Sequence, residues 1–385
     1  MPMNAEQLRC IELARQAIGL SDPNPRVGCV IVCRDGRRAE GHTQAAGQSH
    51  AEAHALSNAQ RLGLDVRGAT AWVSLEPCSH HGRTPPCSSA LIEAGLGQVH
   101  VACLDPNPLV GGRGLSALRQ AGITVVLHDD AWTAAARELN IGFFSRMTRR
   151  RPWVRLKVAA SLDGTTALLN GRSQWITGEA ARRDGHEWRK RAGAVLTGIG
   201  TVMDDDPRLD VRLVPTQLQP LRVVVDSQLR IDPKAQVLQE PGRCLVYSAA
   251  DTKHALPALT KLPNVELATL PAHTSGPSAG KTDLQALLSD LADRGVNELH
   301  VEAGEKLNGS LLREGCVDEL LVYLAPRLLG PGRGLAAFAP DALQSLEEGL
   351  DLQFLDVAAL GPDLRIRALT GSGLSFRSQG ADAAG

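Results

Sequence analysis

Aromatic side chains are scarce in this sequence: phenylalanine, tryptophan and tyrosine together make up 3% of its 385 residues. Charge of one sign is also lacking, because 41 lysines and arginines face 42 aspartates and glutamates, which gives a formal net charge of −1. Nucleic acids are bound by stacked aromatic rings and a basic surface. The composition therefore argues against a nucleic-acid partner, although a local basic patch stays possible.

Long apolar runs are missing as well, so no segment of the sequence could span a bilayer. Residues 1–6 lack the basic and apolar regions of a signal peptide. We therefore expect a cytoplasmic protein with no membrane partner. In that reducing compartment the eight cysteines are interpreted as thiols or metal ligands, not as a disulfide framework. They are Cys10, Cys29, Cys33, Cys78, Cys87, Cys103, Cys244 and Cys316.

The length predicts two domains, and helical and strand patterns alternate in both halves, as in α/β proteins. The basic segment 146–152 could be a phosphate-binding arm or a solvated linker, and we favour the linker. The predicted division is residues 1–147, a linker at 148–152, a second domain at 153–370 and a small, polar, disordered tail at 371–385. Among the predicted helices are 131–144 and 178–192, the latter capped by Thr177.

His50, Cys78 and Cys87 carry the strongest chemical signal. One imidazole and two thiolates can hold Zn²⁺ and leave its fourth position open for water, which is typical of a catalytic zinc. Glu52, two residues after the histidine, is free to move protons. Together these residues indicate a hydrolytic deaminase, in which zinc activates water and a glutamate that does not bind the metal carries the proton.

Three alternatives bear on this site. A closed structural zinc would take His80, His81 or another cysteine as its fourth ligand. Cys29 and Cys33 form a rival pair, but they lie in an apolar strand pattern that predicts core cysteines. His54, one helical turn after His50, could approach the substrate or simply pack on its helix.

The second half places small polar and acidic residues after predicted strands, as in Gly198-Ile199-Gly200-Thr201 and Glu302-Ala303-Gly304. Open α/β sheets bind ligands at such strand ends. A complete G-x-G-x-x-G pattern after the first strand is absent, so a Rossmann domain is not supported.

The zinc segment resembles the cytidine-deaminase superfamily, but eight residues separate its cysteines where the common form has two. That loop (residues 79–86), Pro23-Asn24-Pro25-Arg26-Val27-Gly28 and Asp105-Pro106-Asn107-Pro108 resemble the bifunctional deaminase/reductase family of riboflavin biosynthesis. The resemblance covers nearly the whole chain. It implies an α/β protein with an N-terminal cytidine-deaminase-like three-layer domain and a C-terminal dihydrofolate-reductase-like domain.

For the first domain, the resemblance implies hydrolytic removal of the 2-amino group of a diamino-ribosylamino-pyrimidinone phosphate. His50, Cys78 and Cys87 would bind zinc and Glu52 would carry the proton. Asn24 would contact the pyrimidine, although a turn residue is an equal interpretation of its sequence context. His42 is a further candidate for the substrate. Soft metals other than zinc remain possible with two thiolate ligands.

For the second domain, the resemblance implies reduction of the ribosyl group to ribityl with hydride from NADPH. Two arginines suit a sugar phosphate, since guanidinium binds it bidentately, and a helix start near Lys306 suits the cofactor phosphates. The implied cofactor residues are Ala159, Trp175, Thr201, Asp205, Ser227, Gly304, Glu305, Lys306, Leu307, Asn308, Gly309 and Ser310. The implied substrate residues are Ser173, Arg189, Leu209, Arg212 and Glu302.

Without the resemblance, Trp175 would be read as a packing residue and Arg189 as part of a charged helix face. Two other functions remain at this point: a tRNA-editing deaminase with an appended domain, and a zinc-stabilised scaffold in which Glu52 would be dispensable. The resemblance also suggests a homo-oligomer, either a dimer or a tetramer, that acts on a small molecule.

Overall fold

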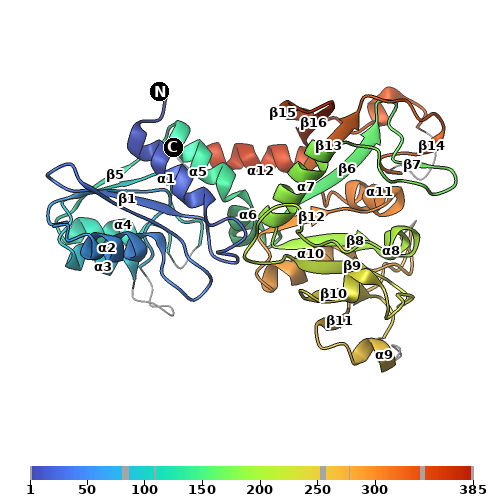
Figure 1. The fold of residues 1–385 in the computed structure, drawn as a ribbon, viewed down its shortest axis with the longest axis horizontal. Coiled ribbons are helices and arrows are strands. Elements are labelled where there is room, and N and C mark those ends of the chain that lie inside the picture. The colour runs from blue at the N-terminus through green and yellow to red at the C-terminus, as the bar shows by residue number, and fades with distance from the viewer. Residues whose placement is uncertain are drawn as a thin grey trace. The chain divides into compact units, whose positions relative to one another are not determined.

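The computed structural model describes residues 2–79, 86–107, 110–251, 257–276, 278–338 and 343–382. They form two compact units, Met1–Arg150 and Arg151–Gly385 (Figure 1). This division falls within the predicted linker 148–152, but the linker is shorter, because α6 (Ile141–Arg149) continues to Arg149. Arg151 is also not a solvated charge, since its guanidinium donates to the carbonyl oxygen of Cys316 at 2.8 Å and pairs with Asp318.

A five-stranded sheet forms the centre of the first unit, and helices cover both of its faces. Helices α1 and α5 pack on one face, and α2, α3 and α4 pack on the other, which gives the predicted three layers (Figure 1). The strands, in the order β2-β1-β3-β4-β5, are β1 (Gly28–Val32), β2 (Arg38–His42), β3 (Thr70–Val73), β4 (Gln98–Val101) and β5 (Thr124–Leu127). The helices are α1 (Ala5–Arg15), α2 (Ala51–Arg61), α3 (Cys87–Glu93), α4 (Arg113–Gln120), α5 (Ala131–Leu139) and α6.

The strand directions in this sheet decide where the site lies. β1 runs antiparallel to β2 and β3, whereas β3, β4 and β5 are parallel. The carboxyl ends of β2, β3 and β4 therefore meet at one edge, and the segments that follow them leave the sheet there. β1 is apolar and almost wholly buried, as a strand covered on both faces should be.

The predicted single helix 131–144 is two helices, because Asn140 interrupts it. The buried Asn140 amide accepts a hydrogen bond from Arg26 N (2.7 Å) and donates one to Arg26 O (2.9 Å). Short polar side chains that bond to backbone groups compete with helix formation. The interruption fixes the backbone just after Asn24.

The second unit is built on a nine-stranded sheet with the order β11-β10-β9-β8-β12-β6-β13-β16-β15. The pairs β13–β16 and β16–β15 are antiparallel, and the other pairs of this sheet are parallel. The strands are β6 (Trp153–Ser161), β7 (Ala167–Leu168), β8 (Ala194–Gly198), β9 (Leu221–Val225), β10 (Cys244–Ser248), β11 (Val265–Thr269), β12 (Glu298–Val301), β13 (Glu319–Ala325), β14 (Gly332–Arg333), β15 (Gln353–Leu360) and β16 (Asp363–Leu369). Strands β7 and β14 pair separately. The helices are α7 (Glu179–Arg191), α8 (Ile199–Asp205), α9 (Pro257–Thr260), α10 (Leu284–Asp293), α11 (Glu305–Arg313) and α12 (Gly371–Asp382), with 3₁₀ turns η1 (Gln236–Leu238) and η3 (Leu346–Glu348).

The two faces of this sheet differ in character. One face is apolar and packs against α10 and α11, with Leu156 and Leu196 in the core. On the opposite face, the part next to α7 is charged: the fully buried Arg155 pairs with Glu298 at 2.9 Å and with Glu319 at 3.0 Å. Over β8–β10 the same face is apolar, with Val195 and Val224 in a second core cluster. Burying these charges costs desolvation, which their pairing offsets, and the pairs connect three neighbouring strands.

Two local predictions in this unit were wrong. The N-cap of α7 is Gly178, not Thr177, and its N–H donates to the Asp363 carboxylate at 2.7 Å. The tail predicted to be disordered forms α12 over Gly371–Asp382. The Phe376 ring lies 5.9 Å from that of Trp153, so tertiary contacts order a segment whose composition predicts disorder.

No helix in the described ranges combines the length and apolarity needed to cross a membrane. All eight cysteines are free, and Cys29 and Cys33 are buried in and beside β1, as predicted for core cysteines.

Candidate functional site

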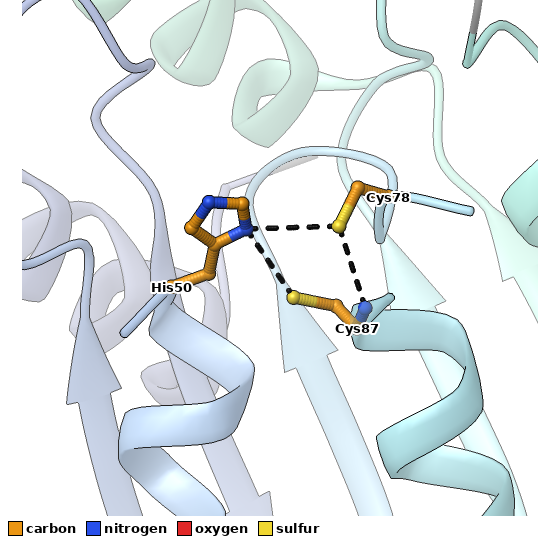
Figure 2. Close-up of side chains that lie close together, drawn as sticks. All are labelled: His50, Cys78 and Cys87. Atoms are coloured by element: carbon orange, nitrogen blue, oxygen red, sulfur yellow. Dashed lines mark hydrogen bonds between the residues drawn. The ribbon is translucent and has the colours of Figure 1, made fainter. Parts of the chain in front are cut away.

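The three predicted zinc ligands converge at the carboxyl edge of the first sheet (Figure 2). His50 is the N-cap of α2, Cys78 follows β3, and Cys87 is the first residue of α3. His50 Nδ1 lies 3.6 Å from Cys78 Sγ and 3.5 Å from Cys87 Sγ. All three ligand atoms lie within 4.8 Å of one another.

These separations can be compared with those of a tetrahedral zinc. With Zn–N and Zn–S bonds of about 2.0 and 2.3 Å, tetrahedral angles place nitrogen and sulfur about 3.5 Å apart. The observed nitrogen–sulfur distances of 3.5 and 3.6 Å match that value. The donor set and these two nitrogen–sulfur distances therefore fit Zn²⁺.

Local charge prepares the cysteines to bind a cation. The hydrogen bond with the Cys87 thiol, helped by His50, lowers the pKa of Cys78 below its ordinary value. The backbone N–H of Cys87 also donates to Cys78 Sγ at 3.3 Å, since this N–H is free at the start of α3. Cys78 is thus favoured as a thiolate, the form that binds metals.

Glu52 lies in the first turn of α2 with 3% of its surface exposed. Its carboxyl contacts the Cys87 thiol but is not one of the three clustered ligand groups. Burial raises the pKa of Glu52 to about 7. A carboxyl that titrates near neutrality can both accept and return a proton.

Two alternatives at this site concern a fourth metal ligand and the role of His54. Within the described ranges no fourth histidine, cysteine or carboxylate joins the cluster, while His80 and His81 lie outside those ranges. His54 turns to the end of β2, where its Nδ1 lies 3.0 Å from Gln44 Nε2 and its ring packs edge-on to His42. His54 therefore packs against His42, and a substrate contact by either residue stays a prediction.

Asn24 lies in the turn before β1, where its N–H donates to Ser21 O at 2.9 Å. Its side chain makes no hydrogen bond to any described residue. An amide left without a protein partner suits a ligand, but its role stays a prediction.

In the second unit, Glu302 directly follows β12 and lies among cationic groups. Arg189 of α7 binds it through Nε and through Nη2, the latter at 3.0 Å from Oε2, and Lys157 Nζ lies 3.5 Å from the same oxygen. Burial alone would raise the pKa of Glu302, but Arg189 and Lys157 outweigh it and hold the pKa well below its usual range. The ionised form of Glu302, which accepts hydrogen bonds, is therefore favoured.

Asp210 joins the other predicted substrate residues to this pair. Its carbonyl oxygen accepts from Arg189 Nη1 at 2.9 Å, and its carboxylate accepts from Arg212 Nη1 at 2.6 Å. Leu209, which precedes it, is buried with a φ of 53°. Arg189, Leu209, Arg212 and Glu302 thus form one group, whereas Ser173 bonds instead to Asp205 at 3.0 Å.

The predicted cofactor residues lie along strand ends and helix starts. Thr201 Oγ1 accepts from Gly304 N at 3.1 Å, which joins the starts of α8 and α11. Ser227 pairs with Thr282 at 3.0 Å, and Ala159 lies on β6. Trp175 is 60% exposed with Arg182 over its ring, so it does not pack in a core.

The stretch from Gly304 to Ser310 divides into two parts. Asn308 is buried and donates to Leu335 O at 3.0 Å, and Gly309 lies so close to Ala337 that a Cβ would meet its carbonyl oxygen at 1.9 Å. Ser310 is also buried. The first turn, Gly304 to Leu307, is the part placed to meet a phosphate.

Four residues that organise these sites were not predicted from the sequence: Lys157 and His300 beside Glu302, Asp210 between the arginines, and Glu76 before the Cys78 turn. Lys157 lies beside the glutamate because β6 and β12 are neighbours in the sheet, whereas His300 lies on β12 itself, two residues before Glu302. Only Glu76 had a local signal, its position immediately before Pro77-Cys78.

Comparison with known proteins gives matches over both units. The chain matches the family model for the cytidine and deoxycytidylate deaminase zinc-binding region over residues 5–103, and that for the RibD C-terminal domain over 152–366. It is 43% identical over 370 residues to the riboflavin biosynthesis protein RibD of Escherichia coli K12, covering 92% of this chain and 96% of that protein. RibD of Aquifex aeolicus is 39% identical over 357 residues, covering 92% and 95%.

Solved structures agree over nearly the full length. Acinetobacter baumannii RibD (form 1) superposes with a TM-score of 0.82 at 39% identity, covering 95% of this chain and 98% of that one. A Thermotoga maritima protein, described as a diaminohydroxyphosphoribosylaminopyrimidine deaminase/5-amino-6-(5-phosphoribosylamino)uracil reductase, gives 0.82 at 32% identity, covering 95% and 97%.

Fold and site define a two-domain enzyme: a zinc-binding deaminase of the cytidine-deaminase type, followed by an NADPH-dependent reductase with a dihydrofolate-reductase-like fold. The chain belongs to the RibD family, the bifunctional deaminase/reductases of riboflavin biosynthesis. The predicted fold class and enzyme class are confirmed, and the tRNA-editing and scaffold interpretations fall away.

Proposed function

We propose that the first unit deaminates 2,5-diamino-6-ribosylamino-4(3H)-pyrimidinone 5′-phosphate, and that the second unit then reduces the ribosyl group of the product to ribityl. The observation that carries the proposal is the convergence of His50, Cys78 and Cys87 at zinc-ligand spacing beside the buried Glu52. The Thermotoga maritima relative, described with both activities, supports the choice of substrate.

In the first unit, His50, Cys78 and Cys87 would hold Zn²⁺, which when bound supplies a Lewis acid that lowers the pKa of water. Glu52 takes the proton of the attacking water and returns it to the departing amino group, a task suited to its pKa of about 7. Asn24 presents its amide to the edge of the pyrimidine.

In the second unit, NADPH would supply hydride to C1′ of the sugar. Glu302, held ionised by Arg189 and Lys157, accepts hydrogen bonds from sugar hydroxyls. Arg212, whose side chain is 41% exposed, is the arginine best placed to reach the phosphate, with Ser173 and Leu209 lining the sugar. Ala159, Trp175, Thr201, Asp205, Ser227 and the first turn of α11 contact the cofactor.

The partners of this enzyme are small molecules, and we infer assembly into a dimer or tetramer by resemblance to the family. We also place the enzyme in the cytoplasm, because eight free thiols are in keeping with a reducing compartment.

The test is an assay of the purified protein on the diamino-pyrimidinone ribosyl phosphate, with and without NADPH, beside Glu52→Gln. Wild type should deaminate without NADPH and consume NADPH only after deamination. Glu52→Gln should do neither on this substrate, yet still reduce the deaminated compound when it is supplied directly. Zinc-loaded wild type that turns over nothing would refute the assignment.

A further inference from the structure

We propose that Glu76 is a positioning residue for the metal centre, whose buried carboxylate ties the turn carrying Cys78 to the start of α4. The inference deepens the proposed function and rests on it, since it takes Cys78 as a zinc ligand. Glu76 is 3% exposed and lies between β3 and that turn.

Both oxygens of the Glu76 carboxylate accept hydrogen bonds from two backbone N–H groups each. Oε1 accepts from Gly114 (3.0 Å) and Leu115 (3.3 Å). Oε2 accepts from Gly112 (2.9 Å) and Asp105 (3.2 Å). The first N–H groups of a helix have no partner within it, and a negative charge is favoured there. Glu76 therefore occupies the start of α4 in place of an N-cap side chain.

The start of α4 also lies in close contact with Pro77, the residue next to the ligand Cys78. A Cβ on Gly114 would lie 2.0 Å from Pro77 O and 3.2 Å from Glu76 Oε1, so only glycine allows this approach. Pro77 has a fixed φ and little freedom, and it is the single residue between Glu76 and Cys78. If Glu76 moves, Cys78 must consequently move too, because Pro77 cannot compensate by changing its conformation.

Cys78 is held on its other side by α3. Its carbonyl oxygen accepts from Ser88 N at 3.1 Å and from Ser88 Oγ at 3.1 Å. The ligand turn is thus fixed between the starts of two helices, one of which also carries Cys87. Through Glu76 and Ser88, the spacing of the two sulfur atoms depends on both helix starts.

Glutamine cannot replace Glu76, because both oxygens act only as acceptors. Its single carbonyl oxygen could serve one pair of N–H groups, while its NH₂ group would face the other pair and leave them unpaired. Gly114→Ala tests the same contact from the helix side. An alanine in a helix interior is ordinarily stabilising, so a loss of metal binding there points to the contact with Pro77.

The experiment compares wild type, Glu76→Gln, Gly114→Ala and a matched control, Asp130→Ala. Asp130 also serves a helix start, accepting from Trp132 N at 2.8 Å, but in α5 on the opposite face of the sheet. Zinc affinity is measured by competition with a chromophoric chelator, and ligand geometry by the absorption spectrum of the Co²⁺-substituted protein. Reductase turnover on the deaminated compound reports whether the second unit is folded.

We expect both site variants to bind zinc roughly tenfold or more weakly, as for other residues that orient metal ligands, and to show altered Co²⁺ bands, with reductase turnover unchanged. Asp130→Ala should match wild type in both metal readouts. Unchanged zinc affinity and Co²⁺ spectrum in Glu76→Gln would overturn the inference, as would an equal loss in the control. If wild-type Co²⁺ protein lacks thiolate bands, the metal assignment itself fails, which is a separate result.

Discussion

In the first unit the predicted ligands lie between His50 and Cys87: two of them stand at helix starts, and Cys78 lies in the turn that follows β3. In the second unit the group around Glu302 draws on β6, α7, the segment after α8 and the end of β12. The first site is compact in sequence and uses rare residue types. The second is scattered and uses arginine, lysine and glutamate, which occur on every protein surface.

The difference shows what each kind of site demands of the chain. Zinc prefers thiolate and imidazole ligands, so the residue types alone indicate a metal site. The charges around Glu302 acquire their role only from burial and from one another. Arg189 and Lys157 keep the pKa of Glu302 well below its usual range, and neither has any signal of its own in the sequence.

The largest effect is expected from Cys87→Ser, which should abolish deaminase activity and leave reductase activity unchanged. A hydroxyl is a poor zinc ligand, so deaminase activity should fall on the order of 10³-fold or more. Zinc content, measured by elemental analysis, should fall with it, while reduction of the deaminated compound should stay at the wild-type rate. Cys33→Ser is the matched control, a buried cysteine outside the cluster. Equal loss of both activities would mean that the units do not fold independently.

The reciprocal variant is Glu302→Gln, which leaves Arg189 and Lys157 without their carboxylate. Reductase kcat/KM should fall about 100-fold, equivalent to about 2.7 kcal/mol of transition-state stabilisation. NADPH absorbance follows the reaction, and deaminase activity should be unchanged. Glu179→Gln, an exposed carboxylate in the first turn of α7, should behave as wild type. A normal kcat/KM in Glu302→Gln would show that Glu302 does not contribute to the substrate site.

The sequence predicted the α/β class, the two-unit organisation and the residues that cluster at zinc-ligand spacing, because these features are local or chemically distinctive. Whether those residues bind zinc, and whether the reductase residues contact NADPH and substrate, stay predictions. Glu76 shows what a sequence motif cannot predict: its position beside Pro77 is evident in the sequence, but its four backbone hydrogen-bond donors are evident only in the structure.

The remaining features depend on which segments become neighbours, and no local pattern specifies that. Lys157 meets Glu302 because β6 and β12 pair, although they are far apart in the chain. Asp363 replaces the predicted Thr177 cap of α7 from a strand near the end of the sequence. Asn140 divides a helix because it bonds to Arg26, near the start.

The charged face of the second sheet should make this unit sensitive to acid. Arg155 and Arg367 outweigh burial and lower the pKa of Glu319 from 4.5 to about 2. The unfolded state therefore binds a proton more readily, so the stabilisation is complete above about pH 4.5 and is lost as pH falls toward 2. Between about pH 6 and pH 3 the loss should be roughly 2 kcal/mol.

Urea unfolding of the wild type at several pH values measures this loss, and Glu319→Gln supplies the reference. The variant should be less stable at neutral pH, because Arg155 loses a buried partner, and its stability should depend less on pH over this range. A variant with the same pH dependence as wild type would assign the acid sensitivity to other carboxylates.

The smallest effect is expected from Phe376→Ala, in the segment where composition misled the prediction. If α12 is held by the contact of Phe376 with Trp153, removal of the ring should destabilise the second unit by about 1 kcal/mol. Urea unfolding measures the change, and Leu346→Ala, at a residue 94% exposed, gives the baseline for an apolar side chain with little to lose. If Phe376→Ala has the same free energy of unfolding as Leu346→Ala, the prediction of a disordered tail would stand, because a disordered ring contributes nothing to folding. A clear difference would instead show that one aromatic contact orders a helix of small and polar residues, just as strand pairing, and not local pattern, places Lys157 beside Glu302.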